Sequence, residues 1–274
     1  FSDDGKSVMR ASIMRRALEY AHQFNVPIVS HCEDVDLAQG GVMNESALST
    51  EIGLPGIPAL AETIVARDIL LAREYGRVHI AHVSTANSVE LIRQAKRRGI
   101  PVTCETAPHY FSLTEDAVKE YDTDAKVNPP LRGKDDVKAI LRGLKDGTIS
   151  IICTDHAPHT ADEKSQPLDK APFGIVGLET AIGLTYTYLV DKGIISLEEM
   201  INKMSVNPRR LLGLKDISMT VGSMANMTIL DVNKKWKVNS SVFHSKSKNT
   251  PFDGLELKCK PIGIVNNLQH LINI

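Results

Sequence analysis

The sequence predicts an α/β fold built on a parallel sheet, and two observations support this prediction. Short apolar runs rich in β-branched residues alternate with longer segments of helical period, which is the pattern of repeated strand–helix units. The apolar runs are continuous rather than alternating, as in strands that are buried on both faces of a parallel sheet. The runs expected to form strands are Val26–Ser30, Val78–Ala81, Ile100–Glu105 and Ile149–Cys153.

Segments of helical period separate these runs. Residues 137–144 carry apolar side chains at positions i, i+3, i+4 and i+7, and residues 60–72 carry a similar apolar stripe. A weaker stripe follows Ser84 and Thr85, which stand where a helix N-cap is expected. Ser196 with a glutamate three residues later predicts a capping box at the start of another helix.

A (β/α)8 barrel of the TIM type fits these units better than a nucleotide-binding sheet, because neither G-x-G-x-x-G nor a P-loop occurs. Such a barrel closes with eight strands, and only four full strands are expected here. The tail of a fifth strand is expected just before the segment Phe1–Gly5. We therefore expect a partial barrel whose first strands precede this sequence.

After Gly193 the pattern changes. Two short helices and then β-like pieces with polar connectors are expected, as in a small β-rich appendage. We therefore predict two parts, residues 1–218 as the C-terminal portion of the barrel and residues 219–274 as the appendage. The helices expected here are Leu197–Met204 and Asn207–Leu212, and the β-like pieces are Met227–Val232 and Pro261–Val265.

Composition excludes several classes of protein. The formal net charge of −1 lacks the basic excess of a nucleic-acid binder. No apolar run approaches the roughly 20 residues of a membrane helix, and no signal peptide is visible. The four cysteines are far apart without a C-x-x-C pair, so we expect them to be reduced and the protein to be cytoplasmic.

Ionisable residues gather where the expected strands end. Because chemistry collects at the C-terminal ends of barrel strands, Asp4, His31, His82 and Asp155 form a candidate metal-binding set. Imidazole and carboxylate ligands suit zinc, and two ions about 3.5–4 Å apart could share one carboxylate. Each residue also has a structural interpretation, since a histidine at a strand end is often only hydrogen-bonded and Asp4 can form an Asx turn.

Other histidines are less informative. His109 follows the third strand and either lines the site or only packs beside it. His79 has the opposite parity to His82 in its strand, so we expect it to face the helices. The remaining candidates without partners, expected at the surface or in packing contacts, are His22, His244 and His270.

At these residues the sequence resembles the dihydroorotases of the amidohydrolase superfamily, in their bacterial class I type. The resemblance covers essentially the whole chain, and its longest motif, TDHAPHTADEKSQPLDKAPFGIVGLETA, is highly specific. The other segments that carry it are SHCED (30–34), AHVST (81–85), NPPLR (128–132) and SKNTPF (247–252).

The resemblance implies reversible conversion of L-dihydroorotate and water to N-carbamoyl-L-aspartate, a step of de novo pyrimidine (UMP) biosynthesis. It implies zinc, two ions per complete site, held by Asp4, His31, His82 and Asp155. Asp4 falls where an aspartate bridges the metals in this type. Asp155 would also be the catalytic residue that takes a proton from the attacking water and gives it to the leaving ring nitrogen.

The same resemblance implies a substrate site. Asn128 and His159 would bind the substrate, and the backbone at Phe173 and Gly174 would close on its ring. Asn128 before two prolines and Gly174 also have ordinary roles in loops and turns. Residues 160–170 are polar and without periodicity, so we expect a mobile loop over the site.

One departure from the family stands out, since its His-x-His pair occurs nowhere in these 274 residues. We therefore expect a fragment that carries part of the metal site and is inactive alone. Alternative functions are an allantoinase- or hydantoinase-like hydrolase, a non-catalytic dihydroorotase-like partner of aspartate transcarbamoylase, or a metal-free binding protein with an open sheet. The family resemblance also implies a homo-oligomer.

Overall fold

A four-stranded parallel sheet organises the first two thirds of the chain, in the order β1–β4–β5–β6. The computed structural model describes residues 1–266 and 269–272. Each strand overlaps one of the predicted apolar runs, which confirms the α/β class with a parallel sheet. The strands are β1 (Ile28–Ser30), β4 (Val78–Ile80), β5 (Val102–Thr106) and β6 (Ile151–Ile152).

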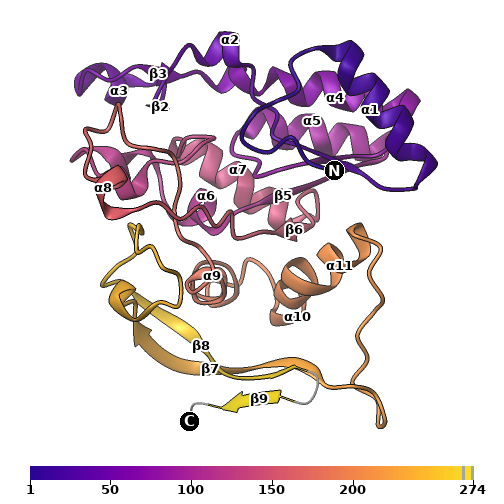
Figure 1. Cartoon of the computed structure of the whole chain (residues 1–274), viewed down its shortest axis with the longest axis vertical. Coiled ribbons are helices and arrows are strands. Elements are labelled where there is room, and N and C mark those ends of the chain that lie inside the picture. Colours follow the sequence, from indigo (N-terminus) through magenta and orange to yellow (C-terminus); the bar gives the residue numbers. More distant parts are fainter. Residues whose placement is uncertain (267–268, 273–274) are drawn as a thin grey trace.

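Four helices cover one face of this sheet and build the main core (Figure 1). Val78 and Ile80 of β4 are buried in the same apolar cluster as Leu18, Ile92 and Ile140 from three of the helices. Complete burial of side chains of this size stabilises a fold by about 1.5–3 kcal/mol each. The helices are α1 (Ala11–Gln23), α4 (Thr63–Tyr75), α5 (Ala86–Arg97) and α7 (Lys134–Lys145).

The expected helix caps are present. Thr85 is the N-cap of α5, and its side chain accepts a hydrogen bond from the backbone N–H of Ser88. Ser196 and Glu199 form the predicted capping box at the start of α10 (Leu197–Ile201). Such caps satisfy N–H groups that the first helical turn leaves without partners, so they fix where the chain enters each helix.

The N-terminal residues extend the sheet beyond β1. Ser2 forms a parallel bridge with Val29, and the N–H of Val29 donates to the carbonyl oxygen of Phe1 at 2.8 Å. Strand pairing therefore reaches Ser2, within the segment that was expected to follow the fifth strand. Asp4 therefore leaves the sheet at the same edge as the residues that follow β1.

The connections between strands and helices contain short elements that periodicity did not reveal, because two to five residues are too few to show a pattern. Among them, β2 and β3 pair in parallel as a two-residue ribbon. The elements are α2 (Val35–Ala38), β2 (Met43–Asn44), α3 (Ala47–Glu51), β3 (Gly56–Ile57), η1 (Ala59–Glu62), α6 (Pro108–Ser112), η2 (Glu115–Val118), η3 (Thr123–Ala125) and α8 (Ala161–Lys164).

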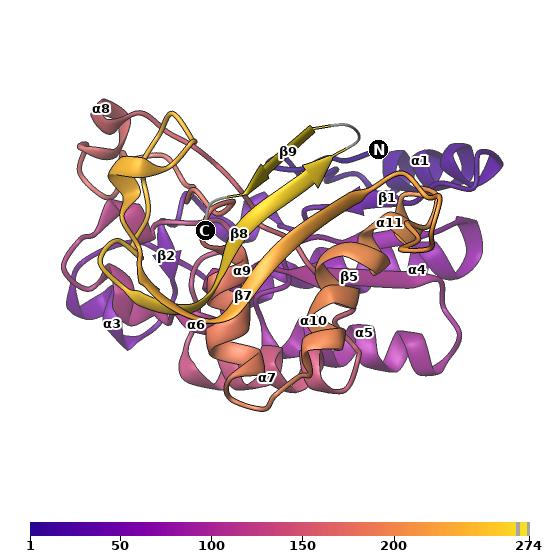
Figure 2. The same cartoon turned by 90° about the horizontal axis from the view of Figure 1, so that it is seen from below.

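The last third of the chain runs through helices into an antiparallel sheet of three strands, β7–β8–β9 (Figure 1 and Figure 2). The two predicted β-like pieces lie within β7 and β8, whereas β9 was not expected. The helical elements are α9 (Ala181–Thr185), η4 (Tyr186–Val190), α10, η5 (Asn202–Val206), α11 (Asn207–Leu211) and η6 (Ser240–Val242), and the strands are β7 (Asn226–Lys237), β8 (Glu256–Asn266) and β9 (Gln269–Ile272).

This C-terminal part shares a core with the loops of the parallel sheet. Phe252 and Leu257 are buried in one apolar cluster with Leu168, Ile175 and Leu184. The cluster lies apart from the core between sheet and helices, and it joins segments about 80 residues apart in sequence. The segments that follow β6 therefore pack against the C-terminal part.

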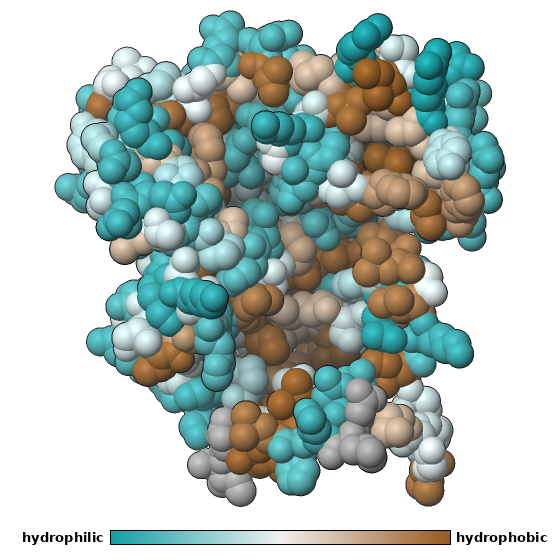
Figure 3. Space-filling model, viewed as in Figure 1, coloured by the Kyte–Doolittle hydropathy of each residue, from teal (hydrophilic) through white to brown (hydrophobic). Residues whose placement is uncertain are grey.

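Other expectations concern the surface and the thiols. Figure 3 shows hydrophobic residues in the hollow between the α/β layer and the C-terminal sheet. Within residues 1–266 and 269–272, no helix has the length and apolar character needed to cross a bilayer. All four cysteines are free, and three of them are buried.

Candidate metal centre

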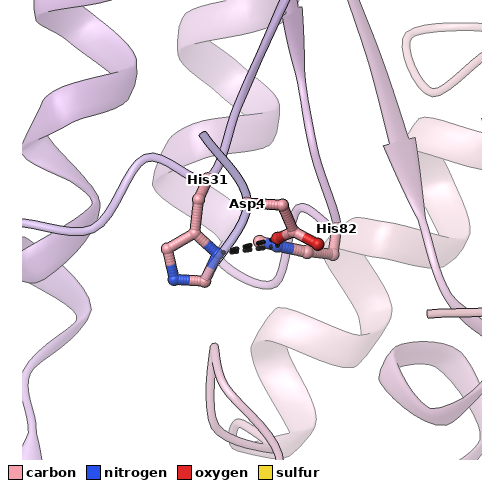
Figure 4. A group of neighbouring side chains, drawn as sticks. All are labelled: Asp4, His31 and His82. Atoms are coloured by element: carbon pink, nitrogen blue, oxygen red, sulfur yellow. Dashed lines mark hydrogen bonds and ion pairs between the residues drawn. The ribbon is translucent and has the colours of Figure 1, made fainter. Parts of the chain in front are cut away.

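Three predicted ligands converge at one edge of the parallel sheet (Figure 4). His31 follows β1 directly, His82 lies two residues after β4, and Asp4 leaves the N-terminal segment beside β1. His31 Nδ1 lies 2.9 Å from His82 Nε2 and 3.4 Å from Asp4 Oδ1. His82 Nε2 lies 3.2 Å from the same oxygen of Asp4. We refer to Asp4, His31 and His82 as the strand-end cluster.

The backbone at these strand ends turns sharply. Positive φ values, which side chains other than glycine rarely adopt, occur at Cys32 (49°), His82 (32°) and Asp155 (47°). Each lies where the chain leaves a strand of the sheet for a loop. Such conformations cost on the order of 1–3 kcal/mol and often mark functional sites, because the surrounding structure must hold them.

The strand-end cluster fits one divalent ion such as zinc. Two imidazole nitrogens and one carboxylate oxygen are a donor set that zinc prefers, with a further position left open. Zinc–ligand bonds of about 2.0–2.1 Å in a tetrahedron separate the donor atoms by roughly 3.3 Å. The observed separations of 2.9, 3.2 and 3.4 Å lie around that value.

Within the strand-end cluster, Asp4 and His31 each stabilise the charged form of the other. Hydrogen bonds from His31 and then His82 hold the pKa of Asp4 far below its usual range. Burial works to lower the pKa of His31, but the carboxylates of Asp4 and Glu33 outweigh it and raise that pKa to about 9. A metal ion that binds His31 must therefore displace a proton.

Glu33 is a neighbour of this cluster that the sequence analysis did not single out. Its Oε2 lies 3.2 Å from His31 Nε2 and accepts a hydrogen bond of 2.8 Å from Asn128 Nδ2. Burial works to raise the pKa of Glu33, while His31 and then Asn128 lower it below its usual value. The signal in the sequence was its place two residues after His31 in the SHCED segment.

Asn128 and Asp155 stand at the border of the cluster. The side-chain oxygen of Asn128 is buried and has no hydrogen-bond partner among the described residues, so it can accept a hydrogen bond from a ligand. Asp155 lies outside the group of three but within ion-pair distance of His109, 3.5 Å away. Burial works to raise the pKa of Asp155, but His109 and then His82 lower it, so this carboxylate is ionised at neutral pH.

Three of the predicted substrate-binding residues, His159, Phe173 and Gly174, lie beside one another. His159 Nε2 lies 2.9 Å from the carbonyl oxygen of Phe173. The N–H of Gly174 donates to the carbonyl oxygen of Lys126 at 2.8 Å. We refer to residues 155–159 and 173–177 as the site loops.

Gly174 is required by close approach as well as by its backbone. Its φ is 144°, and an added Cβ would lie 2.7 Å from the side chain and the carbonyl oxygen of Ala157 and 3.0 Å from His159. Any larger residue would push the two site loops apart. The glycine therefore does more than serve a turn.

Two buried lysines, missed in the sequence, tie the segment expected to be a mobile loop. Lys126 Nζ donates to the carbonyl oxygens of Leu168 and Ala171 at 2.7 and 2.6 Å and lies over the ring of Phe173. Lys164 Nζ donates to the carbonyl oxygens of Thr123 and Pro172. Residues 160–170 also contain the helix α8, so part of this segment has regular structure.

One expectation about the histidines is wrong. His79 does not face the helices, because its neighbours Val78 and Ile80 do. Its ring instead contacts β5 on the other face of the sheet, with Nδ1 2.8 Å from Thr103 Oγ1 and Nε2 3.3 Å from Glu105. Alternation along β4 thus separates two faces of the strand, and His79 lies on the face opposite to the helices.

The fold and the cluster together define a class of α/β protein with a candidate metal centre at the carboxyl ends of parallel strands. Residues 6–265 match the amidohydrolase family. The chain belongs to this family.

Its similar relatives include dihydroorotases. The chain is 56% identical over 259 residues to "Dihydroorotase" of Acetivibrio thermocellus, covering 93% of this chain and 61% of the relative. It is also 56% identical over 263 residues to "Dihydroorotase" of Pelotomaculum thermopropionicum, covering 95% and 62%. The chain thus spans about three fifths of the length of these curated relatives.

Solved structures support the fold. L-Hydantoinase (dihydropyrimidinase) from Arthrobacter aurescens superimposes with a TM-score of 0.87 at 28% sequence identity, covering 100% of this chain and 63% of that one. Dihydropyrimidinase from Brevibacillus agri reaches a TM-score of 0.84 at 22% identity, which speaks for the fold alone. The prediction of a partial barrel with a C-terminal β appendage is confirmed.

Proposed function

We propose that this chain belongs to a zinc-dependent dihydroorotase, which converts L-dihydroorotate and water reversibly to N-carbamoyl-L-aspartate in pyrimidine biosynthesis. The observation that carries the proposal is the convergence of Asp4, His31 and His82 on one point beside the ionised Asp155. The 56% identity to dihydroorotases supports the choice of substrate within the amidohydrolase family.

In this proposal Asp4, His31 and His82 hold zinc, with Asp155 as a further ligand, and the complete site holds two ions. A bound ion would supply Lewis-acid polarisation of the ring carbonyl group. The protein's part is to keep both imidazoles directed at Asp4, whose Oδ1 lies 3.4 Å from His31 Nδ1 and 3.2 Å from His82 Nε2. Glu33, 3.2 Å from the other ring nitrogen of His31, fixes the orientation of that ring.

Asp155 moves the proton. Water adds to the ring carbonyl carbon, the bond from that carbon to the ring nitrogen breaks, and the new carboxyl group becomes a carboxylate by releasing the second proton of the water to solvent. Asp155 accepts a proton from the attacking water and delivers it to the leaving nitrogen, so it begins and ends the cycle ionised. The lowered pKa of Asp155, to which His109 contributes, keeps this carboxylate in the ionised form that proton acceptance requires.

Asn128, His159, Phe173 and Gly174 bind the substrate in this proposal. The buried side-chain oxygen of Asn128, which bonds to none of the described residues, accepts a hydrogen bond from a ring N–H of the substrate. The pair formed by His159 and the Phe173 carbonyl oxygen supplies the opposite wall. A carboxylate on the substrate would draw the imidazole of His159 away from that carbonyl oxygen.

Several wider expectations belong to the same proposal. Residues 1–218 form the barrel portion and residues 219–274 the appendage, although Val238, Phe252 and Leu257 of the second part share a core with the first. The protein is a cytoplasmic homo-oligomer, and aspartate transcarbamoylase is a candidate partner. Free thiols at all four cysteines suit a reducing compartment.

A chimeric enzyme tests the proposal, because the chain spans 61% of its A. thermocellus relative. In the chimera, this sequence replaces the 259 matched residues of that relative. We expect zinc-dependent hydrolysis of dihydroorotate, which Asp155→Asn abolishes and Asp253→Asn, a change of the same type far along the chain, leaves intact. A folded chimera that turns over no dihydroorotate would contradict the proposal.

A second candidate is hydantoin hydrolysis, favoured by the superposition on L-hydantoinase at a TM-score of 0.87. The same chimera offered 5-substituted hydantoins distinguishes the two. Faster turnover of hydantoins than of dihydroorotate would replace the first proposal with this one. The 274-residue chain assayed alone with zinc tests the separate expectation that it is inactive by itself.

A further inference from the structure

Asn249 lies far along the chain, in the connection between β7 and β8, yet its side chain contacts both site loops. Its side-chain oxygen accepts a hydrogen bond of 3.1 Å from the backbone N–H of His159. Its side-chain nitrogen donates to the carbonyl oxygen of Ala157 at 3.1 Å and to that of Gly174 at 3.0 Å. The residue is 5% exposed.

These contacts determine which way the amide points. In the opposite orientation, the NH2 group would meet the N–H of His159, and the oxygen would meet two carbonyl oxygens. The backbone carbonyl oxygen of Asn249 also accepts from the N–H of Val176 at 2.9 Å. One buried residue thus makes four hydrogen bonds to the two site loops.

The bonds hold together segments that pair only briefly with each other. The N–H of Ala157 donates to the carbonyl oxygen of Ile175 at 2.9 Å, and the N–H of Gly177 donates to His156 Nδ1 at 3.1 Å. Asp155 begins this stretch with a φ of 47°, a conformation that its surroundings must hold. At the other end of this stretch, Asn249 accepts the hydrogen bond from the N–H of His159.

The support under Asn249 is well packed. Three residues further on, Phe252 is 3% exposed and lies in the apolar cluster that includes Leu168 and Ile175. Lys248, the residue before Asn249, donates hydrogen bonds from its Nζ to the carbonyl oxygens of Phe243 and Ser245. The connection therefore presents Asn249 from a fixed position, which a positioning role requires.

We propose that Asn249 is a positioning residue, which sets Asp155 and His159 relative to Gly174 so that proton transfer and substrate contact occur in register. The inference deepens the proposed dihydroorotase function and rests on it. It also makes the C-terminal part a contributor to the site rather than a separate appendage.

Amide hydrogen exchange in the 274-residue chain tests the positioning without any need for activity. Asn249→Ala removes all three side-chain bonds, whereas Asn249→Asp keeps the acceptor for His159 and loses both donors. We expect exchange in residues 155–160 and 173–177 to become about tenfold faster or more in Asn249→Ala, with β4 and β5 unchanged. Asn239→Ala is the matched control, because within residues 1–266 and 269–272 the side chain of Asn239 bonds only to Ser241 in the same connection.

Kinetics in the chimera separate positioning from general support. We expect Asn249→Asp to lower kcat by on the order of 10²-fold while KM stays near that of the parent, because the His159 contact remains. Asn249→Ala should change both kcat and KM. An unsubstituted chimera without activity would instead count against the proposed function, while the exchange data still decide the positioning.

Two results would overturn the inference. Unchanged exchange in both site loops of Asn249→Ala would mean that the loops hold their positions without it. A uniform rise of exchange across β4, β5 and the site loops would mean that Asn249 only stabilises the whole fold. If Asn249→Ala does not fold, the same exchange measurement is made on Asn249→Asp, which loses only the hydrogen bonds to the carbonyl oxygens of Ala157 and Gly174. Unchanged exchange in the site loops, or a uniform rise that includes β4 and β5, would then overturn the inference.

Discussion

The strand-end cluster and the site loops lie side by side but are satisfied in opposite ways. Around the cluster, two buried polar atoms have no hydrogen-bond partner among the residues that the structure describes, namely His82 Nδ1 and Asn128 Oδ1. In the site loops, the backbone groups of Ala157, His159 and Gly174 are bonded to one another or to Asn249 and Lys126. Buried polar atoms without partners are costly, so the cluster calls for a ligand and the loops do not.

The difference separates chemistry from support. The cluster, together with the Asp155 carboxylate at the start of the site loops, offers groups that can bind an ion or exchange a proton, and these groups stand at strand ends with strained backbone. The loops supply a fixed frame that is complete without a ligand. Substitutions in the cluster or at Asp155 should therefore affect activity more than stability, whereas a substitution of Lys126, which holds the loop connection through backbone carbonyl oxygens, should do the reverse.

The largest expected effect is on activity. Asp155→Asn in the chimera should lower kcat for dihydroorotate by about 10²–10⁴-fold, because an amide cannot accept and return the proton. The melting temperature should change little, since the amide has the same shape and Asp155 keeps its place in the loop. A comparable loss of kcat in Asp253→Asn, or a matching collapse of the melting temperature, would refute the separation.

Metal binding gives the second effect. Zinc at a free concentration of 100 Kd should raise the free energy of unfolding of the chain by about 2.7 kcal/mol, because only the folded chain assembles the cluster. His31→Ala and His82→Ala should each remove most of this gain, as measured by urea unfolding with and without zinc. His22→Ala is the control, since His22 is an exposed histidine on α1. An equal loss in the control would move the zinc site elsewhere.

The cluster was predictable from sequence, and its supports were not. Strand ends could be located because continuous apolar runs mark buried parallel strands, and the residues after them are known to meet. Asn249, Lys126 and Lys164 lie in connections without periodicity, and their partners are distant backbone groups with no sequence signature. The appendage boundary at residue 219, drawn from the change to β-like pieces, also hid the contacts of Asn249 with the site loops.

The third prediction concerns the frame beneath the loops. Lys126→Met leaves the buried carbonyl oxygens of Leu168 and Ala171 without a donor, so the free energy of unfolding should fall by about 1–3 kcal/mol. Urea unfolding measures the loss, and zinc affinity should stay within a factor of two or so, because Lys126 contacts no ligand of the cluster. Lys119→Met, at an exposed lysine, is the control and should be neutral. A fall in zinc affinity as large as that of His31→Ala would mean that the strand-end cluster and the site loops do not behave as separate regions.

The smallest effect is a dependence on pH that belongs to the loops alone. Burial lowers the pKa of Lys126 and of Lys164 to about 8, from the 10.5 expected in the unfolded chain. Between these values the unfolded chain binds more protons than the folded one, so each lysine makes the free energy of unfolding rise with pH. Below about pH 8 both states are protonated, and the cost of burying the ammonium groups is fully present.

Other groups titrate in the same range, so the test compares variants rather than reading one curve. Burial raises the pKa of the Cys32 and Cys104 thiols, which makes the chain less stable as pH rises past 9. That contribution is shared by the parent and by Lys126→Met, and it cancels in their difference. From pH 8 to 9, the stability advantage of the parent over Lys126→Met should grow by about 1 kcal/mol or less, since one proton contributes at most about 1.4 kcal/mol per pH unit. A difference that stays flat, as it should for Lys119→Met, would mean that the carbonyl oxygens around Lys126 keep its ammonium charged despite burial, and that the frame does not respond to pH.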